Sequence, residues 1–513
     1  MSQPQTDSSG DLLRSRVVAH DRYQLEFRFD YTLFKQQATR YQIVTYFFLP
    51  RSLGVNARLY STAQFYNDIQ SYVRFKTPDF TLQELAVAPT SPLVRIQTLL
   101  AQENWVYARD ITERLIANFK FLRAILKDSL DNELLKLEEE IKRDGAAQAA
   151  SAQWQDELLR AVEESRRIVL LYRDLAPQLR RRDVDARVLN SYQLTDEALS
   201  LVIEDAYLKM LDTLQSRQLA AASSASRHIL AEAVRAELAH RDALHYLTAQ
   251  KGERDAEAYL FRASALKKFT SSVLYLTTTV ESEGYKTEQI MYALAAGISM
   301  VFATVVAFYA QQRYGNFTFP LFVALVVGYM FKDRLKDAMR ALSHRFLRSF
   351  FFDRRTRIRT LDDQHELGYM RERMSFLAED ETPAYVRLAR NRQLITRVDQ
   401  EGQAEEIIRY EKRVLLRGDK VDQLYGDVPP VSAVKDIMRL DVREFLRRMA
   451  DPTERYLTLS DDGDTVKRIK APRVYFINVV QVYYRTDSRS PIHTSRTRVA
   501  LTRRGIHRVE MFA

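Results

Sequence analysis

"IMYALAAGISMVFATVVAFYAQQ", residues 290–312, contains no charged residue, and "YGNFTFPLFVALVVGYMF", residues 314–331, contains none either. A helix rises about 1.5 Å per residue, so the first stretch can cross a hydrocarbon core of about 30 Å and the second is near the lower limit. Gly315, Asn316 and Pro320 indicate a turn followed by a helix start. The two stretches therefore predict a transmembrane helical hairpin over residues 286–331.

Two alternatives to this hairpin remain. It could be a buried soluble hairpin, although soluble core helices seldom lack charge on every face over such a length. The second segment could also be re-entrant instead of spanning. Both membrane versions return the chain to the side it left, so the two large flanking regions share one compartment.

Charge around the hairpin predicts its orientation. The connecting loop contains only Arg313, whereas residues 332–359 contain ten basic and three acidic residues. By the positive-inside rule both flanks are cytoplasmic and the protein lies in a bacterial-type inner membrane. An amphipathic helix follows the hairpin, and we expect it to bind the bilayer and its anionic lipid headgroups. The candidate membrane-surface residues are Lys332, Arg334, Lys336, Arg340, Arg345, Arg348, Arg354 and Arg355. Alternatively, its apolar stripe packs on another helix of the same protein.

The composition is that of a folded, largely water-soluble chain. Of 513 residues, 46% are hydrophobic and 28% charged, and the net charge is +10. The absence of cysteine excludes disulfides, thiolate catalysis and thiolate metal sites. Residues 1–18 lack the apolar core of a secretory signal, and we expect a disordered tip.

Helices are expected over most of residues 99–285. Apolar residues separated by threes and fours run from Ile111 to Ile141, and a second such run extends from Leu158 to Leu179. These runs predict a cytoplasmic helical bundle with an antiparallel coiled-coil hairpin. Further helices are expected at about 193–215, 218–249 and 254–283, the last leading directly into the membrane.

The two ends of the chain alternate apolar and polar residues, as strands do. This pattern occurs in "RYQLEFRFDYTL" (22–33), "RYQIVTYFFLP" (40–50), "RVYFINVVQVYYR" (473–485) and "TRVALTRRGIHRVEMF" (497–512), the last with a turn at Arg504–Gly505. We predict a β-rich α/β region at 19–98, the juxtamembrane helix and further helices at 332–450, and a basic β region at 451–513. The last is expected to join residues 19–60 in one β domain, with two separate β domains as the alternative. The fold class is mainly α with terminal β regions, α+β.

Sequence motifs point to no chemistry. Glu237 and His240 have the spacing of a helical metal-ligand pair, but a second pair is missing, so we interpret them as a solvated helix face. The acidic residues Asp461, Asp462 and Asp464 indicate a hairpin turn and not a calcium loop. Zinc-hydrolase, phosphate-loop and serine-hydrolase motifs do not occur. We therefore predict no catalytic, cofactor-binding or metal-binding residues.

The last 60 residues carry excess positive charge. From residue 454 onward there are twelve basic and six acidic positions. This predicts an anionic partner, either lipid headgroups or an acidic protein, ahead of nucleic acid, with an ordinary basic surface as the alternative. The candidate residues are Arg473, Arg485, Arg496, Arg498, Arg503 and Arg504.

A hairpin between two soluble portions without a chemical motif favours a membrane-tethered, cytoplasm-facing scaffold or sensor with no catalysis of its own. Two alternatives come from other classes. One is a homo-oligomeric, pore-type membrane effector, since small residues near Ala293 and Gly297 would permit close helix approach. The other is an enzyme of envelope lipid or polysaccharide metabolism whose site a single sequence does not reveal.

Overall fold

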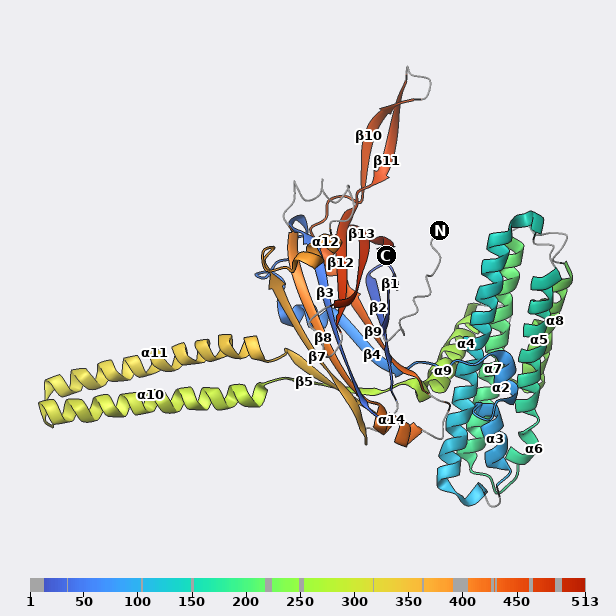
Figure 1. Ribbon diagram of the computed structural model, residues 1–513, viewed down its shortest axis with the longest axis horizontal. Helices are drawn as coiled ribbons and strands as arrows, with labels where there is room; N and C mark the ends of the chain where they lie inside the picture. The colour runs from blue at the N-terminus through green and yellow to red at the C-terminus, as the bar shows by residue number, and fades with distance from the viewer. Residues whose placement is uncertain are drawn as a thin grey trace.

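The computed structural model describes residues 13–34, 36–102, 105–148, 152–216, 224–248, 253–316, 318–361, 364–390, 405–425, 429, 431–460, 465–484 and 491–512. The protein is a mixed α+β structure, 52% helical and 29% strand. Figure 1 shows three parts: a helical bundle, a body of β-sheets, and a long helical hairpin that projects from the sheets away from the bundle.

The bundle is built from long amphipathic helices. These are α4 (Arg109–Gln148), α5 (Ala152–Arg173), α7 (Ala186–Ser216), α8 (Ser224–Ala243) and α9 (Glu253–Ser271), with the shorter α2 (Leu82–Val87), α3 (Pro92–Leu100) and α6 (Ala176–Leu179). Leu115, Leu122 and Leu126 of α4 are fully buried. Apolar residues repeated at intervals of three and four positions lie on one face of a helix, and this face packs into the core. Helix α4 packs on α7 and α3 as well as on α5, so the expected two-helix hairpin is part of a larger bundle.

The sheets are antiparallel throughout. One has four strands in the order β1 (Leu13–Ala19), β2 (Gln24–Thr32), β9 (Ala433–Asp441), β4 (Ile69–Phe75). The other has eight, in the order β14 (Gly505–Phe512), β13 (Pro491–Thr502), β12 (Tyr475–Tyr484), β3 (Ala38–Pro50), β8 (Glu405–Arg417), β7 (Glu366–Leu377), β6 (Arg354–Arg359), β5 (Thr277–Ser282). Strand β3 pairs with β12, so the two ends of the chain meet in one sheet.

Strand and helix positions differ from the sequence-based expectation in three places. Residues 13–18 belong to β1, so the expected N-terminal tip is shorter than predicted, and residues 1–12 lie outside the described part. The helix expected over 254–283 ends at Ser271 as α9 and is followed by η3 (Ser272–Leu274). The β-branched run at 277–280 then favours an extended chain and forms β5. Residues 351–450 were expected to be helical, but the described residues of this range form strands β6 to β9 together with short helices.

Among the described residues, short helices accompany those four strands. They are α12 (Ala384–Arg390), α14 (Gly418–Tyr425) and α15 (Arg443–Leu446). In the middle of β7 buried and partly exposed side chains alternate: Met370, Glu372 and Met374 are buried, whereas Arg371 and Arg373 are partly exposed. This is the pattern of a strand with one covered face. Earlier in the chain lie η1 (Arg51–Leu53), α1 (Thr62–Asn67) and η2 (Trp105–Tyr107).

A ribbon of two strands, β10 (Thr453–Leu459) and β11 (Val466–Pro472), pairs with no other described strand and projects from the body (Figure 1). The acidic turn expected between them at 461–464 lies outside the described residues. The predicted β13–β14 hairpin is confirmed, with its two-residue loop at Arg503–Arg504, one residue before the expected Arg504–Gly505. Gly505, with a φ of 130°, is the first residue of β14.

The two sheets pack face to face around aromatic residues and a buried ion pair. The rings of Phe27 in β2 and Phe47 in β3 lie 5.9 Å apart, edge to face. Lys412 Nζ in β8 lies 2.6 Å from Asp436 Oδ2 in β9, and the two side chains are 2% and 0% exposed. Tyr31 donates to the same carboxylate at 3.2 Å. This pair therefore bridges the two sheets in the core.

Candidate functional site: the projecting hairpin and its attachment

The projecting hairpin consists of α10 (Tyr285–Tyr314) and α11 (Phe319–Phe350), which pack antiparallel. Small residues of α10 face α11: Ala295, Ser299 and Ala310 are 1%, 1% and 3% exposed. A Cβ placed on Gly328 of α11 would lie 3.0 Å from Val306, so the helices are in close contact there. Small residues at such contacts are typical of helix pairs in membranes.

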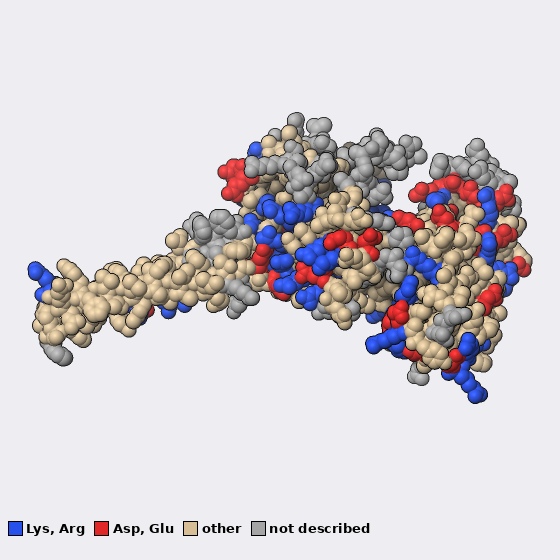
Figure 2. Space-filling view, turned by 60° about the horizontal axis from the view of Figure 1, so that its bottom comes forward, with Lys and Arg blue, Asp and Glu red and all other residues tan. Residues whose placement is uncertain are grey.

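The outer sides of the hairpin are apolar and exposed. Figure 2 shows the hairpin almost free of charged side chains over much of its length, in contrast to the body. Thr287–Tyr314 is long and apolar enough to cross a membrane, and only 17% of its most apolar window is buried. It is the one helix in the described part of the chain that meets this criterion. Large side chains at least half exposed include Ile290, Leu294, Ile298, Val301, Val305, Phe308, Tyr309, Phe319, Phe322, Tyr329, Met330 and Phe331.

The register between α10 and α11 limits the length over which both helices are uncharged. Gly328 lies beside Val306, and Arg340 lies over the ring of Tyr292 at 5.5 Å from its centroid. Lys332, the first charged residue of α11, is therefore level with about Val301. From the hairpin tip to that level both helices are uncharged for only about 18 Å, although α10 alone stays uncharged for about 33 Å at 1.5 Å per residue.

Below that level α11 carries charges beside the apolar surface of α10. Six charged residues follow one another within three turns, and in the described part of the chain none of them forms an ion pair. Asp333, Arg334, Asp337 and Arg340 are exposed. The six are Lys332, Asp333, Arg334, Lys336, Asp337 and Arg340. The base half of the hairpin thus has one apolar helix and one charged helix at the same height.

The remaining expected membrane-surface residues differ in position. Arg345 and Arg348 belong to α11, and their side chains lie outside the described part. Arg354 pairs with the buried Glu372 and stacks on Tyr66 at 4.2 Å. Arg355 instead lies over the ring of Tyr369 at 4.1 Å. The eight residues therefore do not form one continuous surface.

The hairpin is attached to the edge of the large sheet through β5 and β6, which pair with each other. Gly284, which adopts a φ of 86°, caps the N-terminus of α10, and a Cβ there would lie 2.9 Å from the ring of Phe351. Asp353 accepts hydrogen bonds from Tyr66 Oη at 2.9 Å and from the Met374 amide at 2.7 Å. These contacts fix both ends of the hairpin to the edge of the large sheet. The sheet therefore sets the direction in which the hairpin projects.

Three arginines surround one ring at this attachment. The guanidinium groups of Arg371, Arg373 and Arg413 lie 4.5, 4.7 and 5.0 Å from the centroid of Phe352, which is 5% exposed. Arg371 also pairs with Glu283, immediately before α10. Sequence reasoning missed this cluster, since Arg371 and Arg373 come from β7, Arg413 comes from β8 and Phe352 lies between α11 and β6. The alternation in "MRERMSF" (370–376) is the local signal that places Arg371 and Arg373 on one face.

The basic residues expected to bind an anion near the C-terminus are scattered. Arg503 lies 3.5 Å from Asp451 and Arg473 lies 3.9 Å from Glu454, while the backbone oxygen of Arg504 accepts a hydrogen bond from Arg22. Arg485 lies outside the described part of the chain.

Arg496 and Arg498 are neighbours on one face of β13. Burial, together with repulsion from Arg390 and Arg498, lowers the pKa of Arg496 to about 10. Arg498 pairs with Glu510. Both arginines stack on the ring of Phe512, so both are engaged by the protein itself.

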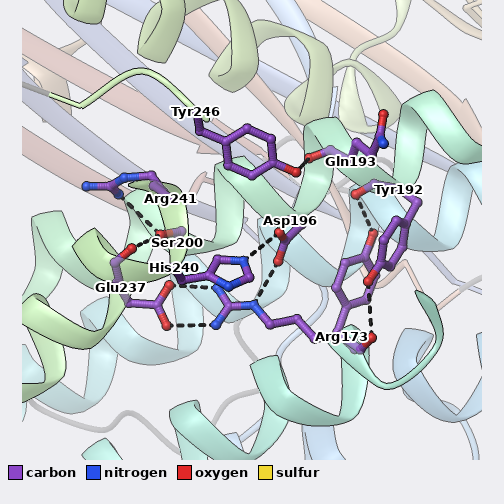
Figure 3. A network of polar contacts seen from close by, with 10 residues as sticks. Arg173, Tyr192, Gln193, Asp196, Ser200, Glu237, His240, Arg241 and Tyr246 are labelled. Carbon is purple, nitrogen blue, oxygen red and sulfur yellow. Dashed lines mark hydrogen bonds and ion pairs between the residues drawn. The ribbon is translucent and has the colours of Figure 1, made fainter. Parts of the chain in front are cut away.

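A second polar network ties the bundle together (Figure 3). Arg173 of α5 contacts Asp196 of α7 at 2.9 Å and Glu237 of α8 at 2.7 Å, and His240 lies 2.8 Å from Asp196. Burial alone would raise the pKa of Asp196, but His240 and Arg173 bring it below its ordinary value. Glu237 is 7% exposed, so the solvated face expected for it is wrong.

This network binds three helices to one another. Arg241, which is fully buried, donates to Ser200 at 3.2 Å and to Glu204 at 2.5 Å. Among the described residues no group of three or more acidic or histidine side chains is arranged to hold a metal ion. The arrangement holds helices α5, α7 and α8 in register.

Comparisons of the chain with protein-family models, with curated proteins and with solved structures gave no match.

Proposed function

We propose that this protein is a membrane-tethered scaffold or sensor without catalytic activity of its own, anchored by the α10–α11 hairpin. The observation that carries the proposal is the exposure of large apolar side chains along a hairpin that leaves the body (Figures 1 and 2). Such a surface in water would drive aggregation, whereas in lipid it needs no other partner.

The position of the hairpin ends supports a single-sided arrangement. Both ends leave from the paired strands β5 and β6, so the bundle and the sheets lie on one side of the anchor. Basic residues in the base half of α11 favour the cytoplasmic side of an inner membrane for that body. The bilayer and its anionic headgroups are then the first partners of the protein.

The depth of insertion follows from the charges. Arg313 lies at the tip and Lys332 about 18 Å below it at 1.5 Å per residue. A bilayer meets such a short apolar belt by local thinning and by long charged side chains reaching the interface. Tyr309 and Tyr314 near the tip and Tyr329 near the lower boundary are at least 49% exposed, as in the aromatic belts of membrane proteins.

A non-catalytic role is supported by how the charged residues are used. In the bundle, Arg173 and Arg241 are bonded to acids on neighbouring helices. At the sheet interface, Lys412 and Asp436 are paired. These groups hold elements together, and the large bundle and the separate β10–β11 ribbon offer surfaces for protein partners.

The test is a variant in which residues 285–350 are replaced by a short Gly-Asn linker, which is feasible because Gly284 and Phe351 are in contact. We expect the full chain to stay in the membrane fraction after alkaline carbonate extraction and the variant to become soluble. A matched control replaces the β10–β11 ribbon (453–472) by the same linker and should stay in the membrane. Release of the full chain by carbonate would overturn the proposal.

A pore-type effector is the second candidate, because α11 carries exposed charges beside apolar α10. Release of a trapped dye from liposomes on addition of purified protein would favour the pore. Retention of the dye in vesicles that demonstrably contain the protein would favour the scaffold.

A further inference from the structure

The half of the hairpin nearest the sheets, below the level of Lys332, combines one charged helix with one apolar helix at the same height. The charges of Lys332, Asp333 and Arg334 indicate that the hydrocarbon core of the bilayer ends at their level, since an unpaired charge in that core is energetically costly. At and below that level α10 still exposes Ile290 by 60%, Leu294 by 53% and Val301 by 64%. Neither lipid nor water is a good environment for both helices there.

The exposed side of α10 has the pattern of a helix–helix seam. Ile290, Leu294, Gly297, Val301, Thr304 and Phe308 follow one another at spacings of four and three residues. This repeat keeps one stripe facing a partner helix in a left-handed coiled coil. The stripe lies opposite Ala295 and Ser299, which face α11, so α11 does not cover it.

Space for close approach exists on this stripe. A Cβ built on Gly297 would meet nothing within 4 Å. Ala293, one turn earlier, is also exposed. Small residues four positions apart allow two helix backbones to approach closely in or near a membrane.

We propose that α10 of a second copy of this chain packs in parallel along this seam, forming a two-fold symmetric dimer through the hairpin. The inference rests on the proposed membrane anchor, because anchoring holds all copies upright at one height and brings each stripe opposite its equivalent. The seam covers the apolar side of α10 below the membrane. The charged α11 helices then lie on the two outer sides of the dimer, in contact with water below the membrane.

The natural absence of cysteine makes the test direct. Single-cysteine variants of the full chain in native membranes would be oxidised with copper phenanthroline. We expect Leu294→Cys to give a disulfide-linked dimer, since two Cα atoms within about 7 Å can be bridged. Ile298→Cys is the matched control: it is one turn away and 50% exposed, but it lies on the flank of the seam. The dimer fraction at 294 should exceed that at 298 several-fold.

A second measurement distinguishes a stable dimer from cross-linking during random collisions in the membrane. Gly297→Leu should shift the protein in lipid nanodiscs from two copies to one by single-molecule photobleaching, while Met300→Leu on the flank should leave two. Equal cross-linking at 294 and 298, or one copy per nanodisc for the unmodified chain, would overturn the dimer. A monomer that resists carbonate extraction would refute only the dimer, whereas carbonate release refutes the anchor itself.

Discussion

Replacing Lys412 by methionine should destabilise the two-sheet body far more than an equivalent change at an exposed ion pair. The Lys412–Asp436 contact is 2.6 Å long and both side chains are at most 2% exposed. Lys412 Nζ also lies 3.6 Å from Glu372. Removing the Lys412 ammonium deprives the buried carboxylates of Asp436 and Glu372 of a neutralising charge. Breaking a buried ion pair costs about 3–5 kcal/mol of unfolding free energy.

The control is Lys209→Met, because Lys209 and Asp205 also lie 2.6 Å apart but are 64% and 53% exposed. An exposed pair contributes about 0.2–1 kcal/mol. The double variant Lys412→Met/Asp436→Asn removes the uncompensated charge and keeps an oxygen acceptor for Tyr31, so it should recover a large part of the loss.

The assay is urea unfolding of the full chain in detergent micelles. Near-UV circular dichroism follows the packing of all buried aromatic side chains, including Tyr31 and Tyr410 in the sheets. Fluorescence follows the bundle, since both tryptophans, Trp105 and Trp154, are buried there. A loss below about 1 kcal/mol for Lys412→Met, equal to that of the exposed control, would refute the reasoning from burial.

Two further predictions concern the same body. Burial alone would raise the pKa of Glu372, but Lys412 and Arg354 hold this pKa below its ordinary value of 4.5. The charged form of Glu372 therefore stabilises the fold above about pH 4.5, and this contribution is lost as the pH falls. Urea titrations from pH 7 to pH 3 should show the unfolding free energy decreasing, and Glu372→Gln should make that decrease shallower. Gly368→Ala places a Cβ 2.2 Å from the Leu415 carbonyl oxygen and should cost about 1–3 kcal/mol by forcing β7 and β8 apart. Thermal unfolding would measure that cost, and an unchanged midpoint would show that the strands accommodate the methyl group.

Local patterns predicted many elements because each depends on a few neighbouring residues. Alternation over residues 22–33 and 40–50 placed β2 and β3, and the uncharged run at 290–312 placed most of α10. The same reasoning failed at 351–450. There "MRERMSF" (370–376) forms the middle of β7, with Met370, Glu372 and Met374 buried, and its adjacent charges obscure the alternation that marks a strand.

The candidate site was predictable only in its outline. The uncharged lengths indicated a hairpin, but the register that puts Lys332 level with Val301 depends on how Gly328 fits against Val306. The cluster around Phe352 could not be predicted, because Arg371 and Arg413 become neighbours only when β7 pairs with β8.

The sequence by itself determined that this chain has a long apolar segment between two charge-rich portions and strands at both ends, because charge, apolar length and side-chain period are properties of short segments. Tertiary structure alone decided that β3 lies beside β12, that Lys412 meets Asp436 between the sheets, and that the apolar side of α10 is left uncovered opposite α11. These contacts join residues far apart in the chain or fix one helix against another, and their register depends on the packing of whole surfaces, which no single segment contains.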